Sequence, residues 1–284
     1  MNNVISQRKI LLYIVYGESQ AYYDGAIFSF LTFMHWVKDK DKIEAVVLTE
    51  KPDKFKGYPI KIIKLSQAQK NDWSLNGKYH FRIKNRGMAY VIDKLLLKDL
   101  DKVLFFDTDT YFHKSPLPLF SLIDSSNAVF YLNEGLIYHR KRFHVYVESL
   151  QGKKIEVEGK IYELSKKSAL WGSLMIGITA NMRPSLNWAD QLMLKFYHMV
   201  PAHTIEPFSL SESLLRDYKI LEGKRFVSLY STSRKKEYVT NILSKFFNEN
   251  ESLPFLEQVK LSQNVRLKRP LLVLIKQRIK QLKN

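Results

Sequence analysis

Residues 102–112 read KVLFFDTDTYF, in which four apolar residues are followed by two aspartates one position apart. The apolar part, residues 103–106, is typical of a strand buried on both faces of a parallel sheet. Ligands of open α/β sheets bind beyond the carboxyl ends of such strands. The stretch therefore predicts a buried strand that places Asp107 and Asp109 in a binding site.

Three further β-rich runs surround this strand, at residues 10–16 (ILLYIVY), 45–49 (AVVLT) and 60–65 (IKIIKL). Residues 21–37 and 85–97 carry apolar side chains at three-to-four spacing, which predicts helices between the strands. Strands that alternate with helices predict a doubly wound α/β domain with a mostly parallel, Rossmann-like sheet.

The pattern changes after the acidic stretch. Residues 142–164 alternate in polarity and contain two glycine turns, which predicts an inserted β-hairpin or meander. Residues 168–180 (SALWGSLMIGITA) return to an apolar strand pattern, and we expect helices at residues 187–199 and 210–218.

Composition limits the class of protein. The chain has 284 residues, of which 45% are hydrophobic, enough for one large α/β domain with an appendage. The absence of cysteine excludes disulfides and thiolate chemistry and fits a reducing compartment, so we expect a cytoplasmic protein. Residues 10–16 are too few for a signal peptide or a membrane span, and no longer apolar run occurs.

The net charge of +17 predicts an anionic partner. We divide the chain into a main domain (residues 1–230), a helical extension (231–265) and a basic amphipathic tail (266–284). The tail predicts a helix that binds the anionic inner face of a membrane, each cation contributing about 1 kcal/mol; a helix packed on the main domain is the alternative. Its cations are Arg266, Lys268, Arg269, Lys276, Arg278, Lys280 and Lys283.

The two aspartates have the spacing of a cation site. In an extended segment residues i and i+2 point the same way, so Asp107 and Asp109 can share one cation. Mg²⁺ and Mn²⁺ take oxygen ligands and often complete their shell with substrate phosphates. Two carboxylates beside a buried strand also repel one another unless a cation or donor compensates them. An ordinary polar turn after a strand is the alternative.

A second functional interpretation is a phosphatase of the haloacid dehalogenase type, in which the first aspartate is a nucleophile. That motif normally follows the first strand of its domain. Here about a hundred residues of strands and helices precede Asp107, which disfavours the phosphatase.

A longer stretch carries a more specific resemblance. Residues 79–120 (YHFRIKNRGMAYVIDKLLLKDLDKVLFFDTDTYFHKSPLPLF) resemble the centre of GT-A glycosyltransferases, especially bacterial lipopolysaccharide galactosyl- and glucosyltransferases related to glycogenin. Those proteins have a helix, a D-K-V-L-type strand, D-x-D and a proline- and leucine-containing segment in this order. The resemblance covers about residues 8–225 in architecture and about forty residues in motif.

The resemblance implies a GT-A fold with a nucleotide-sugar part at about residues 8–112 and an acceptor part at about 113–230. It implies transfer of a hexose from a nucleoside diphosphate sugar, a UDP-sugar, to a glycan or lipid-linked acceptor, with retention of configuration. Asp107 and Asp109 would hold Mn²⁺ or Mg²⁺, with Thr108 among the donor-binding residues.

By position in that family, the loop after the first strand binds the nucleoside through Tyr16, Gly17, Ser19 and Tyr22. A glycine that only permits a turn is the simpler interpretation of Gly17. No glycine-rich dinucleotide or P-loop motif occurs, which disfavours oxidoreductases and P-loop enzymes.

Arg82, Lys84 and Arg86 precede the helix that leads to the acidic strand. The family usually has a basic residue on this helix near the donor sugar, and Arg86 is our candidate, one turn earlier than expected. A solvated helix start is the alternative.

Trp171, Gly172 and Ser173 match the family's small-residue strand, where the backbone approaches the sugar and Trp171 could stack on it. A buried core tryptophan is the competing interpretation.

Residues 203–210 (HTIEPFSL) lie where relatives carry an acidic and amide-bearing segment beside the anomeric carbon. Glu206 is therefore the candidate catalytic carboxylate or donor-sugar ligand, followed by Asp190 and Glu212. Surface carboxylates on helices are the simpler alternative, and the role of a base depends on the stereochemistry.

Residues 230–238 (YSTSRKKEY) place Arg234, Lys235 and Lys236 at a predicted helix start, which would clamp a diphosphate. Solvated charge is the alternative. The family's late H-x-x-G-x-x-K-P-W metal-binding segment does not occur, so a histidine as third metal ligand cannot be carried over from the family, and the third ligand stays open.

Two other classes compete with the glycosyltransferase. A basic nucleic-acid-binding protein fits the charge and the 13% aromatic content, but no recognised RNA- or DNA-binding motif is present, and we expect no nucleic-acid partner. A sugar nucleotidyltransferase would need an early glycine-rich loop, which the sequence does not show.

Overall fold

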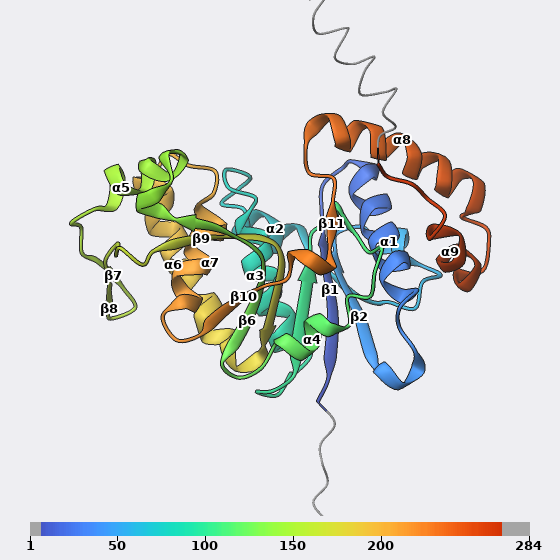
Figure 1. Cartoon of the computed structure of the whole chain (residues 1–284), viewed down its shortest axis with the longest axis horizontal. Coiled ribbons are helices and arrows are strands. Elements are labelled where there is room, and N and C mark those ends of the chain that lie inside the picture. Colours follow the sequence, from blue (N-terminus) through green and yellow to red (C-terminus); the bar gives the residue numbers. More distant parts are fainter. Residues whose placement is uncertain (1–6, 269–284) are drawn as a thin grey trace, which may run out of the picture.

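The computed structural model describes residues 7–268 and forms a layered α/β structure (Figure 1). A central sheet of seven strands has helices on both faces. The sheet is mostly parallel, which confirms the expected fold class and is compatible with a Rossmann-like fold. Within this part of the chain, no helix is both long enough and apolar enough to cross a bilayer.

The sheet has the strand order β10-β6-β9-β4-β1-β2-β3. All neighbouring strands are parallel except that β9 runs antiparallel to both β4 and β6. The seven strands are β1 (Lys9–Val15), β2 (Ile43–Thr49), β3 (Lys61–Lys64), β4 (Lys102–Phe106), β6 (Asn127–Leu136), β9 (Ala169–Thr179) and β10 (Lys219–Glu222).

Strand β1 shows how the sheet builds two cores. Successive side chains of a strand point to opposite faces. Ile10, Leu12 and Ile14 accordingly belong to one hydrophobic core, whereas Leu11 and Tyr13 belong to the other. The unbroken apolar run therefore forms a central strand that is buried on both sides.

Two helical layers cover these cores. On one face, aromatic side chains join α1 to the C-terminal helices: Phe28 meets Phe246 of α8 and Phe30 stacks on Phe255 of α9. The other face is covered by α3, α6 and α7, with α2 beside α3. The helices are α1 (Gln20–Met34), α2 (Gln67–Trp73), α3 (Arg82–Lys94), α6 (Arg183–Met199), α7 (Ile205–Leu215), α8 (Ser233–Asn250) and α9 (Phe255–Ser262).

The remaining elements are short. Strand β5 (Thr110–Tyr111) pairs with β11 (Ser228–Leu229), and β7 (Ile155–Val157) forms a hairpin with β8 (Lys160–Tyr162). Two short helices, α4 (Pro118–Leu122) and α5 (His144–Leu150), flank β6 in the sequence. Single 3-10 turns occur at Asp39–Asp41, Pro52–Phe55, Ile137–His139, Lys141–Phe143, Ala180–Met182 and Lys224–Phe226.

The region expected to be a hairpin is only partly one. The turn at Glu158 and Gly159 does join two strands, but residues 144–150 form helix α5. Tyr146 and Leu150 are buried four positions apart, which is the spacing of a helix face. Val145 and Val147 flank Tyr146, and β-branched and aromatic residues of this kind are typical of strands.

Candidate active site

Asp107 and Asp109 lie in the turn that follows β4, where backbone contacts fix the loop. The Asp107 N–H donates to the Leu174 carbonyl (2.8 Å), and the Tyr230 N–H donates to the Asp109 carbonyl (3.1 Å). The Tyr230 hydroxyl also donates to the Thr108 carbonyl (3.1 Å). Strand β5, directly after the acidic turn, also pairs with β11, directly before α8. The backbone before α8 is therefore hydrogen-bonded to the acidic turn and to the strand that follows it.

Helix α1 approaches the same turn at Gly25. A Cβ atom at this position would lie 2.4 Å from the Thr108 carbonyl oxygen and 2.8 Å from the Tyr230 hydroxyl. Only a residue without a side chain allows this contact between helix and loop.

The aspartates open into a cavity of about 520 Å³. Its walls come from the ends of β1 and β4, the starts of α1, α3 and α7, strands β6 and β9, and the first turn of α8. The lining of this cavity includes Tyr16, Tyr22, Lys84, Asp107, Thr108, Asp109, Glu134, Gly172, Ser173, Thr204, Glu206 and Lys236.

Lys84 of α3 holds the centre of the site. Its Nζ lies 3.3 Å from Asp107 Oδ2 and 3.5 Å from Glu206 Oε2, and it donates to the Ser173 carbonyl and hydroxyl, both at 3.1 Å. Burial alone would lower the pKa of Lys84, but Asp107 and Glu206 outweigh this effect and raise it. Lys84 is therefore a fixed cation in the floor of the cavity.

Glu206 is the second buried carboxylate, with only 1% of its surface exposed. The Ser173 hydroxyl donates to its Oε2 (2.9 Å), and its backbone N–H donates to the Tyr79 hydroxyl (2.8 Å). Its Oε1 has no hydrogen-bond partner among the described residues. Burial raises the pKa of Glu206, while Lys84 opposes the shift. The free oxygen can accept a hydrogen bond from a ligand hydroxyl.

The two aspartates differ in their surroundings. Burial raises the pKa of Asp107 to about 7, although Lys84 lowers it. Asp109 is 8% exposed, and its Oδ2 lies 3.0 Å from Lys236 Nζ. The other oxygen, Oδ1, is buried and has no partner within residues 7–268. A carboxylate oxygen that is buried without a donor fits a cation that completes the site.

The chain supplies few ligands for such a cation. Among the described residues, no group of three histidine, aspartate or glutamate side chains has the arrangement of a metal site. A cation held by only two carboxylates completes its coordination with substrate oxygens and water.

The structure brings several residues predicted for the nucleotide to this cavity. Tyr16 and Tyr22 line it. Gly17 adopts a φ of 99°, and its N–H donates to the Glu50 carboxylate. A turn with this positive φ favours glycine, which explains the residue type at position 17 without a role in binding. Ser19 is the exposed residue before α1 and is not among the lining residues.

Strand β9 contributes its two small residues to the cavity, but not its tryptophan. Gly172 and Ser173 line it. A Cβ at Gly172 would lie 3.2 Å from Glu134 Oε1, so the glycine keeps the two strands close. The Trp171 side chain is buried in the hydrophobic core, as the competing interpretation expected, and it does not line the cavity.

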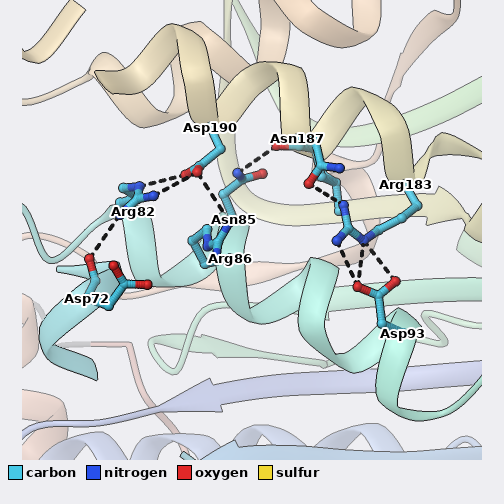
Figure 2. A network of polar contacts seen from close by, with 9 residues as sticks. Asp72, Arg82, Asn85, Arg86, Asp93, Arg183, Asn187 and Asp190 are labelled. Carbon is cyan, nitrogen blue, oxygen red and sulfur yellow. Dashed lines mark hydrogen bonds and ion pairs between the residues drawn. The ribbon is translucent and has the colours of Figure 1, made fainter. Parts of the chain in front are cut away.

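Arg86 and Asp190 lie together outside the cavity lining, in a network between α3 and α6 (Figure 2). Arg82 contacts both carboxylate oxygens of Asp190 at 2.6 and 2.8 Å, and Arg86 approaches Oδ2 at 3.5 Å. The Asn85 side chain donates to the Leu186 carbonyl (2.9 Å). Because these contacts hold α3 against α6, they position Lys84, which lies on the same turn of α3.

Glu212 and Lys235, two other predicted site residues, do not line the cavity. Glu212 is buried and accepts hydrogen bonds from the hydroxyls of Tyr162 (3.0 Å) and Ser168 (2.6 Å), which gives it a structural role away from the cavity. The Lys235 ammonium donates to the Leu229 carbonyl. The Arg234 side chain lies outside the described residues, as do residues 269–284 of the predicted tail.

Of the three basic residues at this helix start, Lys84 and not the predicted Arg86 enters the cavity. A signal for it exists in the sequence: Lys84, Met88, Val91 and Ile92 form one helix face at spacings of four, seven and eight. A lysine on an apolar face must be paired with carboxylates when that face is buried.

Comparison of this sequence with models of known protein families and with curated proteins finds no match.

Proposed function

We propose that this protein is a metal-dependent hexosyltransferase with a GT-A type fold. It would transfer a hexose from a nucleoside diphosphate sugar, a UDP-sugar by the resemblance, to a glycan or lipid-linked acceptor. The observation that carries the proposal is the pair Asp107 and Asp109 in a cavity at the end of β4, facing the buried Lys84 and Glu206.

The charges of the cavity support a diphosphate leaving group. Asp107 and Asp109 would hold Mn²⁺ or Mg²⁺, which when bound stabilises the negative charge on the departing diphosphate. Lys236 lies at the first turn of α8 and is half-exposed, so its ammonium group can turn toward the phosphate oxygens. Lys84 instead stays with Asp107 and Glu206 and keeps both carboxylates in place.

Glu206 is the group we assign to the sugar. Its unpartnered Oε1 can accept a hydrogen bond from a donor-sugar hydroxyl or stabilise positive charge that develops at the anomeric carbon. Ser173 and Lys84 fix the orientation of the carboxylate. Tyr16 and Tyr22 offer aromatic surface for the base at the β1 side of the cavity.

The test is a screen of nucleotide sugars with Mn²⁺ or Mg²⁺ that measures released nucleoside diphosphate. We expect Asp107→Ala and Asp109→Ala to lower the rate by about a hundredfold or more, because both remove charge from the cation site. Asp53→Ala is the matched control, since Asp53 is exposed and pairs only with Lys56. Full activity in both site variants would refute the metal role.

A further inference from the structure

A cationic segment follows β6 directly. Residues 139–144 read HRKRFH, and every one of them except Phe143 is exposed. We call residues 139–144 the basic segment. It is separate from the predicted basic tail, and neither the cation site nor the donor site described above accounts for it.

Two side-chain contacts fix the basic segment at the rim of the cavity. Arg142 Nη2 lies 2.8 Å from Glu134 Oε2, and Glu134 lines the cavity. Helix α5 follows the segment, and its Tyr146 hydroxyl lies 2.8 Å from the hydroxyl of Thr204, another lining residue. Glu134 belongs to β6, which lies on the opposite side of β4 from β1 in the sheet, and Thr204 directly precedes α7. The segment thus borders the cavity at the rim formed by β6 and the start of α7.

The basic segment keeps most of its charge available to a ligand. Within residues 7–268, neither Arg140 nor Lys141 has a carboxylate at ion-pair distance. Arg142 uses only Nη2 toward Glu134, and its side chain is 60% exposed. Three cations in sequence therefore face solvent beside the cavity, with one carboxylate that orients Arg142.

We propose that the acceptor is an anionic saccharide whose phosphate group binds the basic segment. This inference rests on the proposed function, because it assigns the acceptor end of the same cavity. Guanidinium groups bind phosphate oxygens through paired, charge-assisted hydrogen bonds, and Lys141 adds a mobile ammonium group. A phosphate held here leaves the saccharide free to extend toward Gly172 and Glu206.

The position of the segment favours a phosphate on the acceptor over a lipid headgroup of a membrane. Arg142 is paired with a carboxylate that lines the cavity, so the basic segment is held beside the cavity rather than elsewhere on the surface. Because membrane lipid would also be attracted by exposed cations, the experiment must distinguish the two sources.

The test uses Arg140→Ala/Lys141→Ala and a control with the same change in charge, Lys166→Ala/Lys167→Ala, whose lysines are also exposed. The probe is a phosphorylated, deacylated lipopolysaccharide core oligosaccharide, before and after phosphatase treatment. Its binding is measured by calorimetry with Mn²⁺ and UDP present. Binding of UDP with Mn²⁺ and binding to anionic phosphatidylglycerol vesicles are measured in parallel.

We expect the wild type and the control to bind the phosphorylated oligosaccharide about five- to tenfold more tightly than the dephosphorylated one. The Arg140→Ala/Lys141→Ala variant should lose this preference and still bind UDP normally. Equal binding of both oligosaccharides by the wild type, or no binding of either, would overturn the inference. So would an equal loss in the control variant, or a loss confined to vesicle binding. Failure of wild-type UDP binding would instead overturn the proposed function, and this inference with it.

Discussion

Glu206 and Lys84 form a buried pair whose members control each other's charge. Burial favours the neutral form of the carboxylate, whereas the neighbouring ammonium group favours the ionised form. The Ser173 hydroxyl forms hydrogen bonds with both groups and so fixes their positions relative to each other. Removal of one partner would leave a buried charge without compensation, so the pair acts as a unit.

The raised pKa of Glu206 gives a testable pH dependence. As pH rises through the ordinary glutamate range, the unfolded chain releases its proton before the folded chain does, so this residue lowers the free energy of unfolding with increasing pH. Glu206→Gln should therefore show a smaller loss of stability between pH 5 and pH 8 in urea unfolding. It should also slow hexose transfer by about a hundredfold. Unchanged pH dependence and unchanged rate would contradict the assignment.

At the level of single residues, the sequence predicted the two aspartates and Glu206 as site candidates, and the structure brings all three to one cavity. It did not predict Lys84. The choice between Lys84 and Arg86 depends on which face of α3 meets the sheet and which meets α6, and that follows from packing between distant segments.

Helix α8 connects the C-terminal extension to the acidic turn through its first residues. Lys236 lies 3.0 Å from Asp109 Oδ2, where it neutralises a carboxylate that a metal would also need. The preceding strand β11 pairs with β5 and fixes the start of the helix beside the turn. In the proposed complex, Lys236 would compete with the cation for Asp109 but would favour the bound diphosphate.

Substitution of Lys236 by methionine should have opposite effects on the two ligands. The affinity of the nucleotide-free protein for Mn²⁺ should rise about threefold, because a competing ion pair is removed. Binding of UDP in the presence of Mn²⁺ should weaken about tenfold, because a charge-assisted contact to phosphate is lost. Lys245→Met, on the same helix but paired with Glu249, is the control. Parallel changes in both affinities would argue against this role.

The strands and helices themselves were largely predictable, because β1, β2 and β4 are apolar runs and α1 and α3 have helical spacing. Helix α5 was not predicted, since its short sequence contains the β-branched residues Val145 and Val147 and the aromatic Tyr146, which are typical of strands. Strand β6 was missed as well. Its pairing with β9 shifts register twice, so its inward positions follow no single period.

On the scale of the whole molecule, a single sheet supports both the nucleotide-sugar part and the acceptor part of the proposed enzyme. Strands β1 to β4 form the side with Tyr16, and β9, β6 and β10 form the side with Glu134. The antiparallel placement of β9 between β4 and β6 could not be read from local sequence, because strand order is decided by contacts across long chain distances. This placement puts Leu174 opposite Asp107 and brings Gly172 and Ser173 of β9 into the lining of the cavity.

The central claim is that Asp107 and Asp109 bind a divalent cation that holds a nucleoside diphosphate. The most direct measurement is calorimetric titration of UDP into the wild type and Asp109→Asn, each with and without Mn²⁺. We predict that the wild type binds UDP only when Mn²⁺ is present, and that Asp109→Asn weakens this binding at least about tenfold, or about 1.4 kcal/mol. UDP binding that is independent of both Mn²⁺ and Asp109 would contradict the account.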